Sequence, residues 1–179
     1  MESSKVAWGI EVGDFALKAM RIQMVDDVVT VTDFAVIPHQ RVLTDPSVSD
    51  RAGMIRVTLG AFTQQHAERL ASEPIVMSLP GSVGFARFAT IPAVDAKSMR
   101  KMVEYEARQQ IPFPIEEVEW DSHMLAPDAS GQCGIGIFAV TKERLQELLS
   151  LYSECGIEPD VLTLSSVAVY NALNYDLEF

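Results

Sequence analysis

Hydrophobic residues fall into three short runs at the start of the chain. β-Branched and aliphatic residues dominate each run, and the runs are Val6–Val12, Leu17–Met24 and Val28–Ile37. Two dipeptides that suit hairpin turns, Gly13-Asp14 and Asp26-Asp27, separate them. This pattern predicts an antiparallel meander of three strands.

The next segment changes from the period of a strand to the period of a helix. Between Ser47 and Ala71, four side chains recur at helical spacing: Ile55, Leu59, Phe62 and His66. Gly53 and Gly60 lie in the same segment and lower its helix propensity. A short apolar strand, Ile75–Leu79, follows and ends at Pro80-Gly81, a strong turn signal. The predicted order so far is β-β-β-α-β.

A second block repeats the alternation from Val83 onward. A strand reaches Ile91, and Asp95 is placed to cap a helix that Pro112 ends. This helix has one apolar stripe, formed by Met99, Met102, Val103, Ala107 and Ile111. It is followed by an alternating strand at Val118–Met124, a loop, a mostly apolar strand at Cys133–Val140 and a helix from Thr141 to Gly156. The block is predicted to be β-α-β-β-α.

The pattern ends with a strand at Val161–Leu164 and a helix that begins at Ser165 or Ser166 and runs toward Leu173. No flexible linker or low-complexity tract separates the two blocks, so we predict that the second is inserted into the first. We therefore expect an α/β fold with two subdomains, residues 1–82 with 158–179 and residues 83–157.

The charge of the chain limits its partners. Its 179 residues are 48% hydrophobic and carry a net charge of −11. A globular protein of this charge repels nucleic acid and an anionic membrane at long range. The amino terminus has neither a signal-peptide core nor a membrane span, so we expect a cytoplasmic protein that reaches the inner membrane only through a partner. Cys133 and Cys155 lie in apolar surroundings and are expected to be free, buried thiols.

Common catalytic signatures are lacking in the sequence. His39, His66 and His123 are isolated, and no nucleophile elbow, zinc-protease motif or Walker motif occurs. Structural roles fit the three histidines best. The sequence thus disfavours a hydrolase or a metalloenzyme.

The turn after the first strand has the components of a phosphate site. Backbone N–H groups in a tight turn can point at a phosphate, Gly13 allows a close approach, and Lys18 adds a positive charge. The same residues also make an ordinary hairpin in which Lys18 is a solvated strand residue. The residues alone leave both interpretations open.

Several short motifs resemble those of the type IV pilus assembly protein PilM, an actin-like family related to the cell-division protein FtsA. In chain order they are Gly9-Ile10-Glu11-Val12-Gly13 with Lys18-Ala19, Ser78-Leu79-Pro80-Gly81-Ser82, Ile91-Pro92, Ile111-Pro112-Phe113-Pro114-Ile115-Glu116-Glu117-Val118 and Gly156-Ile157-Glu158-Pro159. The resemblance implies the first lobe of an actin-like, ribonuclease-H-like fold, with a small α+β subdomain inserted at residues 83–157. It also implies that the second lobe, which supplies a second phosphate loop and the adenosine pocket in that family, lies outside these 179 residues.

The resemblance also implies a nucleotide role for the opening turn. Similar proteins have an aspartate near hydrated magnesium and a serine or threonine at a phosphate, and Glu11 and Asp14 occupy these positions here. Glu11 can still serve hydrated magnesium, whereas Asp14 would repel a phosphate about 4 Å away by about 4 kcal/mol. Three interpretations follow: an ATP and magnesium site formed by Glu11, Gly13, Asp14 and Lys18, a nucleotide fold that no longer binds, or a simple hairpin.

The motif Ile111–Val118 resembles a segment that borders a peptide-binding groove in similar proteins. In similar proteins that groove receives a short cytoplasmic peptide of a single-span inner-membrane pilus protein. The resemblance implies Phe113, Ile115 and Val118 as apolar anchors. An acidic rim would select a basic neighbour, and it comprises Glu116, Glu117, Glu119 and Asp121. The structural alternative is a proline-fixed helix exit whose apolar residues pack on the core beside a solvated strand face.

We therefore predict a cytoplasmic actin-like scaffold that links a membrane-embedded pilus or secretion complex to its motor ATPase by capturing a peptide. Nucleotide would shift the arrangement of the lobes rather than be turned over. Two alternatives are a cytoplasmic adaptor of a general secretion system and an ATP-dependent kinase of the same superfold. Self-association into filaments is also compatible with the fold.

Overall fold

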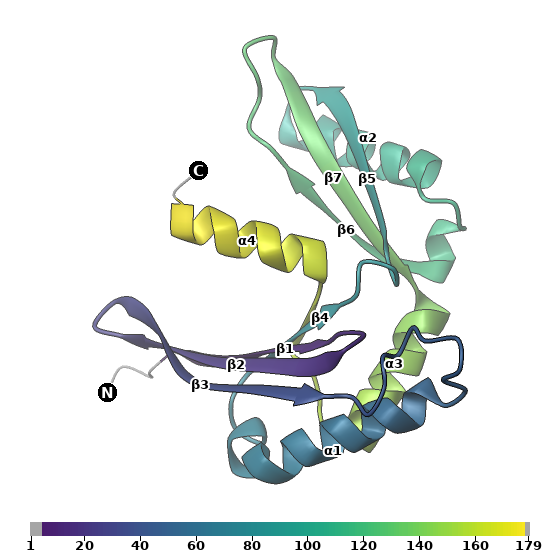
Figure 1. Cartoon of the computed structure of the whole chain (residues 1–179). Coiled ribbons are helices and arrows are strands. Elements are labelled where there is room, and N and C mark those ends of the chain that lie inside the picture. Colours follow the sequence, from purple (N-terminus) through teal and green to yellow (C-terminus); the bar gives the residue numbers. More distant parts are fainter. Residues whose placement is uncertain (1–4, 178–179) are drawn as a thin grey trace. The chain divides into compact units, whose positions relative to one another are not determined.

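The elements follow the predicted order (Figure 1). The structure, a computed structural model, describes residues 5–177 and the side chains of residues 5–175. The elements are β1 (Val6–Val12), β2 (Ala16–Val25), β3 (Val28–Pro38), α1 (Arg51–Leu70), β4 (Ile75–Leu79), β5 (Phe85–Pro92), α2 (Ala96–Gln110), the 3-10 turn η1 (Ile115–Glu117), β6 (Val118–Met124), β7 (Gln132–Thr141), α3 (Lys142–Glu154), β8 (Val161–Leu164) and α4 (Ser165–Leu177). They form two compact units: unit 1 contains the residues up to Gly81 and from Leu148 onward, and unit 2 is Ser82–Glu147.

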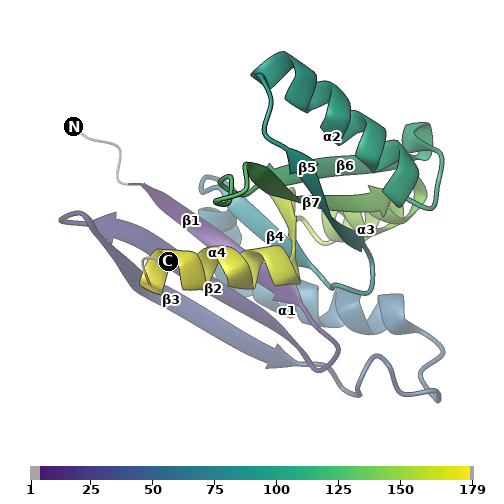
Figure 2. The same ribbon diagram turned by 90° about the horizontal axis from the view of Figure 1, so that it is seen from above.

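Unit 1 is built on a five-stranded sheet with the order β3-β2-β1-β4-β8. The three meander strands pair antiparallel, whereas β1 with β4 and β4 with β8 pair parallel. Helices α1 and α4 lie on opposite faces of this sheet (Figures 1 and 2). The central strand β1 therefore contributes to the core, with Trp8 fully enclosed and its ring in edge contact with Phe62 of α1.

The turn between β2 and β3 contains only Asp26 and Asp27. Both residues have positive φ, 49° and 61°, which is the backbone of the tight hairpin turn that matches strand twist. Aspartate tolerates this conformation better than most non-glycine residues. This two-residue turn therefore fixes the register of the β2–β3 hairpin.

Helix α1 is continuous over its twenty residues despite two glycines. Asp50 caps it, since its Oδ1 accepts a hydrogen bond of 2.7 Å from the backbone N–H of Gly53. Leu59 and Phe62 are fully buried against the sheet. Burial of these side chains outweighs the propensity that the glycines lose.

Unit 2 is a three-stranded antiparallel sheet, β5-β7-β6, with α2 packed on one face. The predicted stripe of α2 forms this core, where Met99, Val103 and Ala107 meet the alternate residues Cys133, Ile135, Ile137 and Ala139 of β7. Asp95 caps α2 as expected, accepting hydrogen bonds from the N–H groups of Lys97 and Ser98.

Helix α3 is shared by the two units. The compact division falls between Glu147 and Leu148, in the middle of the helix, whereas the sequence pattern placed the end of the insert at residue 157. Leu151 and Tyr152 are buried, and Glu154 forms an ion pair with Arg56 of α1 at 2.8 Å. These contacts join the second half of α3 to unit 1.

Candidate functional site

The turn after β1 brings Glu11 and Lys18 together. The two residues are opposite each other in the β1–β2 ladder, and Lys18 Nζ donates to Glu11 Oε2 at 3.0 Å. The backbone N–H of Gly13 donates to the carbonyl of Ala16 at 3.1 Å, which closes the turn. One of the donors that a phosphate would need is thus already used inside the hairpin.

His39 connects this turn to α1 through two hydrogen bonds. Its Nε2 lies 2.9 Å from the carbonyl oxygen of Gly13, and its Nδ1 lies 3.0 Å from Oγ1 of Thr58 in α1. Because a carbonyl only accepts, Nε2 carries the proton and the Thr58 hydroxyl donates to Nδ1 when the ring is neutral. His39 is therefore structural, as predicted from its isolation in the sequence.

The fit of this turn to a nucleotide is limited. Glu11, Asp14 and Lys18 together carry a net charge of −1, and a phosphate would have to compete with Glu11 for Lys18. The described residues contain no group of three or more His, Cys, Asp or Glu that could hold a metal ion. Binding of ATP and magnesium at Glu11, Gly13, Asp14 and Lys18 stays a prediction.

The three predicted peptide anchors lie in different surroundings. Val118 is only 2% exposed and belongs to the core of unit 2, and Ile115 packs against that core. Phe113 is 37% exposed, with its ring centre 5.1 Å from that of Phe85. Only Phe113 of the three presents a substantial apolar surface.

The predicted acidic rim is partly neutralised by basic neighbours. Glu116 pairs with Arg108 at 3.2 Å, and Glu119 lies 3.6 Å from Lys142. Hydrogen bonds from its own backbone N–H and from Arg108 lower the pKa of Glu116. All four rim carboxylates are on exposed residues, so they are available to a basic partner.

An aromatic pair that was not predicted from the sequence lies on the face of the unit 2 sheet opposite α2. Phe88 of β5 is 77% exposed, and its ring meets that of Phe138 edge-on at 6.2 Å. A Cβ on Gly136 would lie 3.0 Å from the Phe138 ring and 3.3 Å from the Phe88 ring. Glycine thus lets both rings lie close to the sheet. The signal in the sequence was the alternation of glycine with isoleucine in Cys133–Val140.

Acidic residues share this face with the aromatic pair. Asp121 is opposite Phe138 in the β6–β7 ladder, and Glu119 is opposite Val140. Directly opposed residues of antiparallel strands project from the same face. An exposed aromatic surface and two carboxylates therefore lie side by side in unit 2.

Unit 1 also exposes apolar side chains on one face of its hairpin. They are Met20 and Ile22 of β2 and Val31, Phe34 and Val36 of β3. Arg21 and Asp33 mark the other face, where Arg21 binds Glu73 through two hydrogen bonds of 2.8 and 2.7 Å. The hairpin is thus amphipathic.

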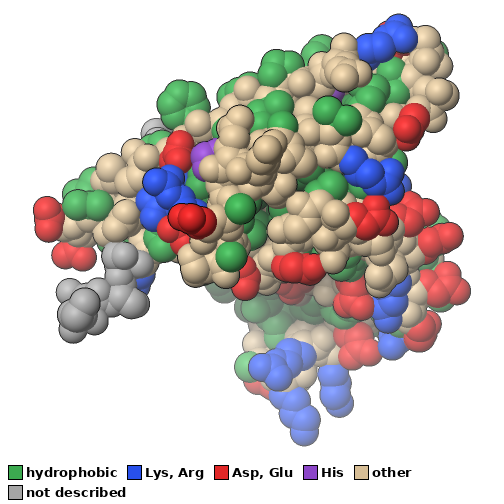
Figure 3. All heavy atoms as spheres, turned by 90° about the horizontal axis from the view of Figure 1, so that it is seen from below, with side chains coloured by type: hydrophobic (Ala, Val, Ile, Leu, Met, Phe, Trp, Pro, Cys, Tyr) green, Lys and Arg blue, Asp and Glu red, His purple; other side chains and the backbone are tan. Residues whose placement is uncertain are grey.

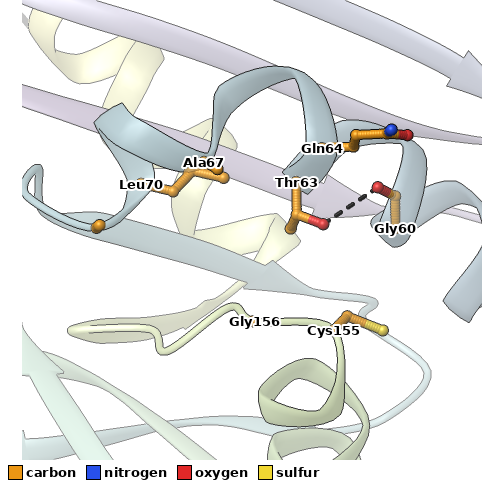
Figure 4. A pocket seen from close by; sticks show the side chains of 8 residues that line it. Gly60, Thr63, Gln64, Ala67, Leu70, Cys155 and Gly156 are labelled. Carbon is orange, nitrogen blue, oxygen red and sulfur yellow. Dashed lines mark hydrogen bonds between the residues drawn. The ribbon is translucent and has the colours of Figure 1, made fainter.

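Among the surface hollows of unit 1 are three with volumes of about 360, 480 and 570 Å³. The smallest lies between α1 and the turn after α3, where Thr63 and Ala67 face Cys155 and Gly156 (Figure 4). Burial raises the pKa of Cys155, which disfavours a reactive thiolate. Basic and acidic side chains are interspersed on the side of the protein where α1 lies (Figure 3). None of the three hollows includes Glu11, Gly13, Asp14 or Lys18.

The comparison with known families decides the family of the chain. The model of the type IV pilus assembly protein PilM matches residues 9–177. The chain belongs to the PilM family. None of the curated proteins matches it at a significant level.

Two solved structures resemble this PilM-family chain. A chain of a PilM–PilN type IV pilus biogenesis complex is 25% identical, and the match covers 96% of this chain and 51% of that one, with a TM-score of 0.68. The cytoplasmic domain of EpsL, an inner-membrane component of the type II secretion system of Vibrio cholerae, is 12% identical over 88% of this chain and 56% of that one, with a TM-score of 0.52. The second likeness shows the fold alone.

The predicted family and the predicted actin-like α/β fold class are confirmed. The chain spans about half the length of the solved structures that it matches. Within residues 5–177, no helix has the length and apolar character needed to cross a bilayer.

Proposed function

We propose that this PilM-family chain is a cytoplasmic scaffold of type IV pilus assembly that binds a short peptide of a single-span inner-membrane pilus protein. The family match and the likeness to a PilM–PilN complex support a membrane partner of the PilN type. This partner would hold the protein at the periphery of the inner membrane. Nucleotide binding and a link to the motor ATPase stay predictions from the sequence.

The observation that carries the proposal is the aromatic pair of unit 2, in which Phe88 is exposed and Phe138 is half-buried. Phe88 and Phe138 form an apolar platform over Gly136, and Phe88 leaves most of its surface in solvent. Aromatic side chains are common anchors in binding sites because they bury a large area with few rotatable bonds. A short peptide with apolar side chains can bury this surface.

The acids beside the platform define which peptide would fit. Asp121 is exposed on the same face as Phe138, and Glu119 is the next acid on that face. Opposite charges across an interface select the partner and speed the encounter. We therefore expect a peptide in which a lysine or arginine adjoins the apolar anchors.

The test is a calorimetric titration with the amino-terminal cytoplasmic peptide of the single-span membrane protein encoded beside this one. Phe88→Ala should weaken binding by about tenfold or more, since truncating a central aromatic anchor removes about 2 kcal/mol. Phe34→Ala is the matched control, because Phe34 is 72% exposed but lies in unit 1.

Binding that is unchanged in Phe88→Ala would contradict the proposed platform. Binding that is lost in Phe34→Ala instead would place the peptide on the hairpin of unit 1. Phe113→Ala separates the sequence-predicted anchor from the platform, because Phe113 contacts Phe85 rather than the Phe88–Phe138 pair.

A further inference from the structure

A cluster of basic side chains at the start of α2 contrasts with the charge of the chain. Lys97, Arg100 and Lys101 lie within five positions of an acidic protein and are all exposed. Residues three and four apart lie on one side of a helix, so the three side chains form one patch.

The cations of this patch form no ion pair with a carboxylate, unlike most other lysines and arginines that the structure describes. Those that form ion pairs with carboxylates are Lys18, Arg21, Arg41, Arg56, Arg69, Arg108, Lys142 and Arg144. Among the described side chains, no carboxylate pairs with Lys97, Arg100 or Lys101. Glu104, an acid further along α2, pairs with Arg108 instead, and the carboxylate of the cap residue Asp95 accepts from the backbone N–H groups of Lys97 and Ser98. The three side chains therefore carry a charge of +3 that no ion pair compensates, with the single negative charge of Asp95 at the cap beside them.

The position of the patch is unfavourable for the helix itself. The amino-terminal end of a helix carries a partial positive charge, so a cation in the first turn, as Lys97 is here, is destabilising, whereas Arg100 and Lys101 lie one turn further on. A residue choice that breaks a local rule of stability often marks a functional surface. The choice of lysine at position 97 is thus better explained by an external anion than by the needs of the helix.

Two exposed neighbours indicate what kind of anion this is. Val94 precedes the cap of α2, and Tyr105 follows Lys101 by one turn, and both are exposed. Tyrosine and isolated apolar residues beside lysine and arginine suit the boundary between lipid head groups and acyl chains. We therefore favour a lipid surface over an acidic protein segment as the partner of this patch.

We propose that Lys97, Arg100 and Lys101 form a docking surface for the anionic head groups of the inner membrane. This inference rests on the proposed function, in which a membrane partner already holds the protein near the bilayer. The net charge of −11 opposes approach from a distance, but its field is screened beyond about 8 Å at physiological salt. Once the protein is tethered, the local contact acts at high effective concentration.

The expected contribution follows from the number of cations. Each lysine or arginine at an anionic membrane strengthens binding by about fivefold, so three give about a hundredfold at most. Repulsion by the surrounding acids reduces this gain, and a tightening of about tenfold is expected. Such an effect orients a tethered protein but does not hold a free one.

The test tethers the full chain artificially and does not need the natural partner. The protein carries a carboxyl-terminal histidine tag and is titrated with vesicles that contain a little nickel-chelating lipid, with or without phosphatidylglycerol. Phosphatidylglycerol should tighten the apparent affinity of the unaltered protein by about tenfold at low salt. The gain should vanish at high salt and in K97Q/R100Q/K101Q.

The matched control is R108Q/K142Q/R144Q, which removes three positive charges from α2 and α3 that are already paired. It should keep the gain. The charge-preserving variant K97R/R100K/K101R should also keep it, and circular dichroism checks that each variant is folded.

The proposal is overturned if phosphatidylglycerol does not tighten binding of the unaltered protein, or if the control loses as much as K97Q/R100Q/K101Q. Binding to poly-glutamate through the same three residues, with no response to phosphatidylglycerol, would assign the patch to an acidic protein instead. Peptide binding in solution by K97Q/R100Q/K101Q should be unchanged, which separates this proposal from the proposed function.

Discussion

Glu11 and Lys18 face each other across the first two strands, with Lys18 Nζ 3.0 Å from Oε2 of Glu11. The lysine that the opening turn would offer to a phosphate is thus already compensated by the carboxylate that would approach magnesium. A nucleotide would have to break this pair while also facing the charge of Asp14. Weak binding, if the site is used, is the physical expectation.

Asp14→Ser tests this electrostatic argument. Removing the like charge should tighten binding of magnesium ATP by between about tenfold and a thousandfold, according to the distance and the local dielectric. Titration with a fluorescent ATP analogue would measure the change. Glu117→Gln serves as control, since it removes one exposed negative charge from unit 2. Equal effects of the two substitutions would mean that only net charge matters.

Thr58→Val tests the connection between α1 and the opening turn. The substitution keeps the side-chain shape but leaves Nδ1 of buried His39 without its donor, at a cost of about 1 to 2 kcal/mol in the free energy of unfolding. Urea denaturation would measure it. Thr58→Ser keeps the hydroxyl and should retain slow hydrogen exchange at the amide of His39, which donates to the carbonyl of Phe15. A similar loss in both variants would point to packing instead.

Gly60 and Gly53 are expected to respond oppositely to alanine. A Cβ on Gly60 has open space around it, so Gly60→Ala should stabilise α1 by about 1 kcal/mol through helix propensity. A Cβ on Gly53 would overlap the carboxylate of Asp50, which caps the helix, and Gly53→Ala should destabilise the protein. Thermal unfolding of the two variants gives the comparison, and a destabilised Gly60→Ala would reveal a close approach at that position.

The ion pair of Glu73 with Arg21 should make stability depend on pH. Hydrogen bonds from the Arg21 guanidinium hold the pKa of Glu73 below its ordinary value of about 4.5. This contribution is fully present above that ordinary value and is lost as the pH falls through the lower folded value. Glu73→Gln should therefore destabilise the protein at neutral pH by about 2 kcal/mol, and the difference from the unaltered protein should shrink below pH 4.5. A difference that stays constant on acidification would contradict the assignment.

The order and the type of the elements could be predicted from local pattern. Alternating residues such as Val118–Met124 and capped segments such as the one after Asp95 form the expected strand and helix because local propensity and burial agree there. Gly53 and Gly60 weakened the prediction of α1, but the packing of Leu59 and Phe62 maintains the helix.

Exposure was harder to predict than secondary structure. The sequence pattern predicts both Val118 and Phe88 as apolar residues of strands. In the structure Val118 is buried under α2, whereas Phe88 projects into solvent. Which face of a strand is covered depends on contacts distant in sequence, so an anchor could not be told from a core residue. The boundary inside α3 depends likewise on contacts such as Glu154 with Arg56.

The two thiols provide native reporters for the two units separately. Cys133 is buried under α2 in unit 2, whereas Cys155 is partly accessible beside the hollow of unit 1. A thiol reagent should modify Cys155 slowly in the folded protein, because its raised pKa leaves little thiolate at neutral pH. Modification of Cys133 requires unit 2 to open. The timing of the two reactions in one sample would therefore distinguish local opening of unit 2 from unfolding of the whole chain, without any introduced label.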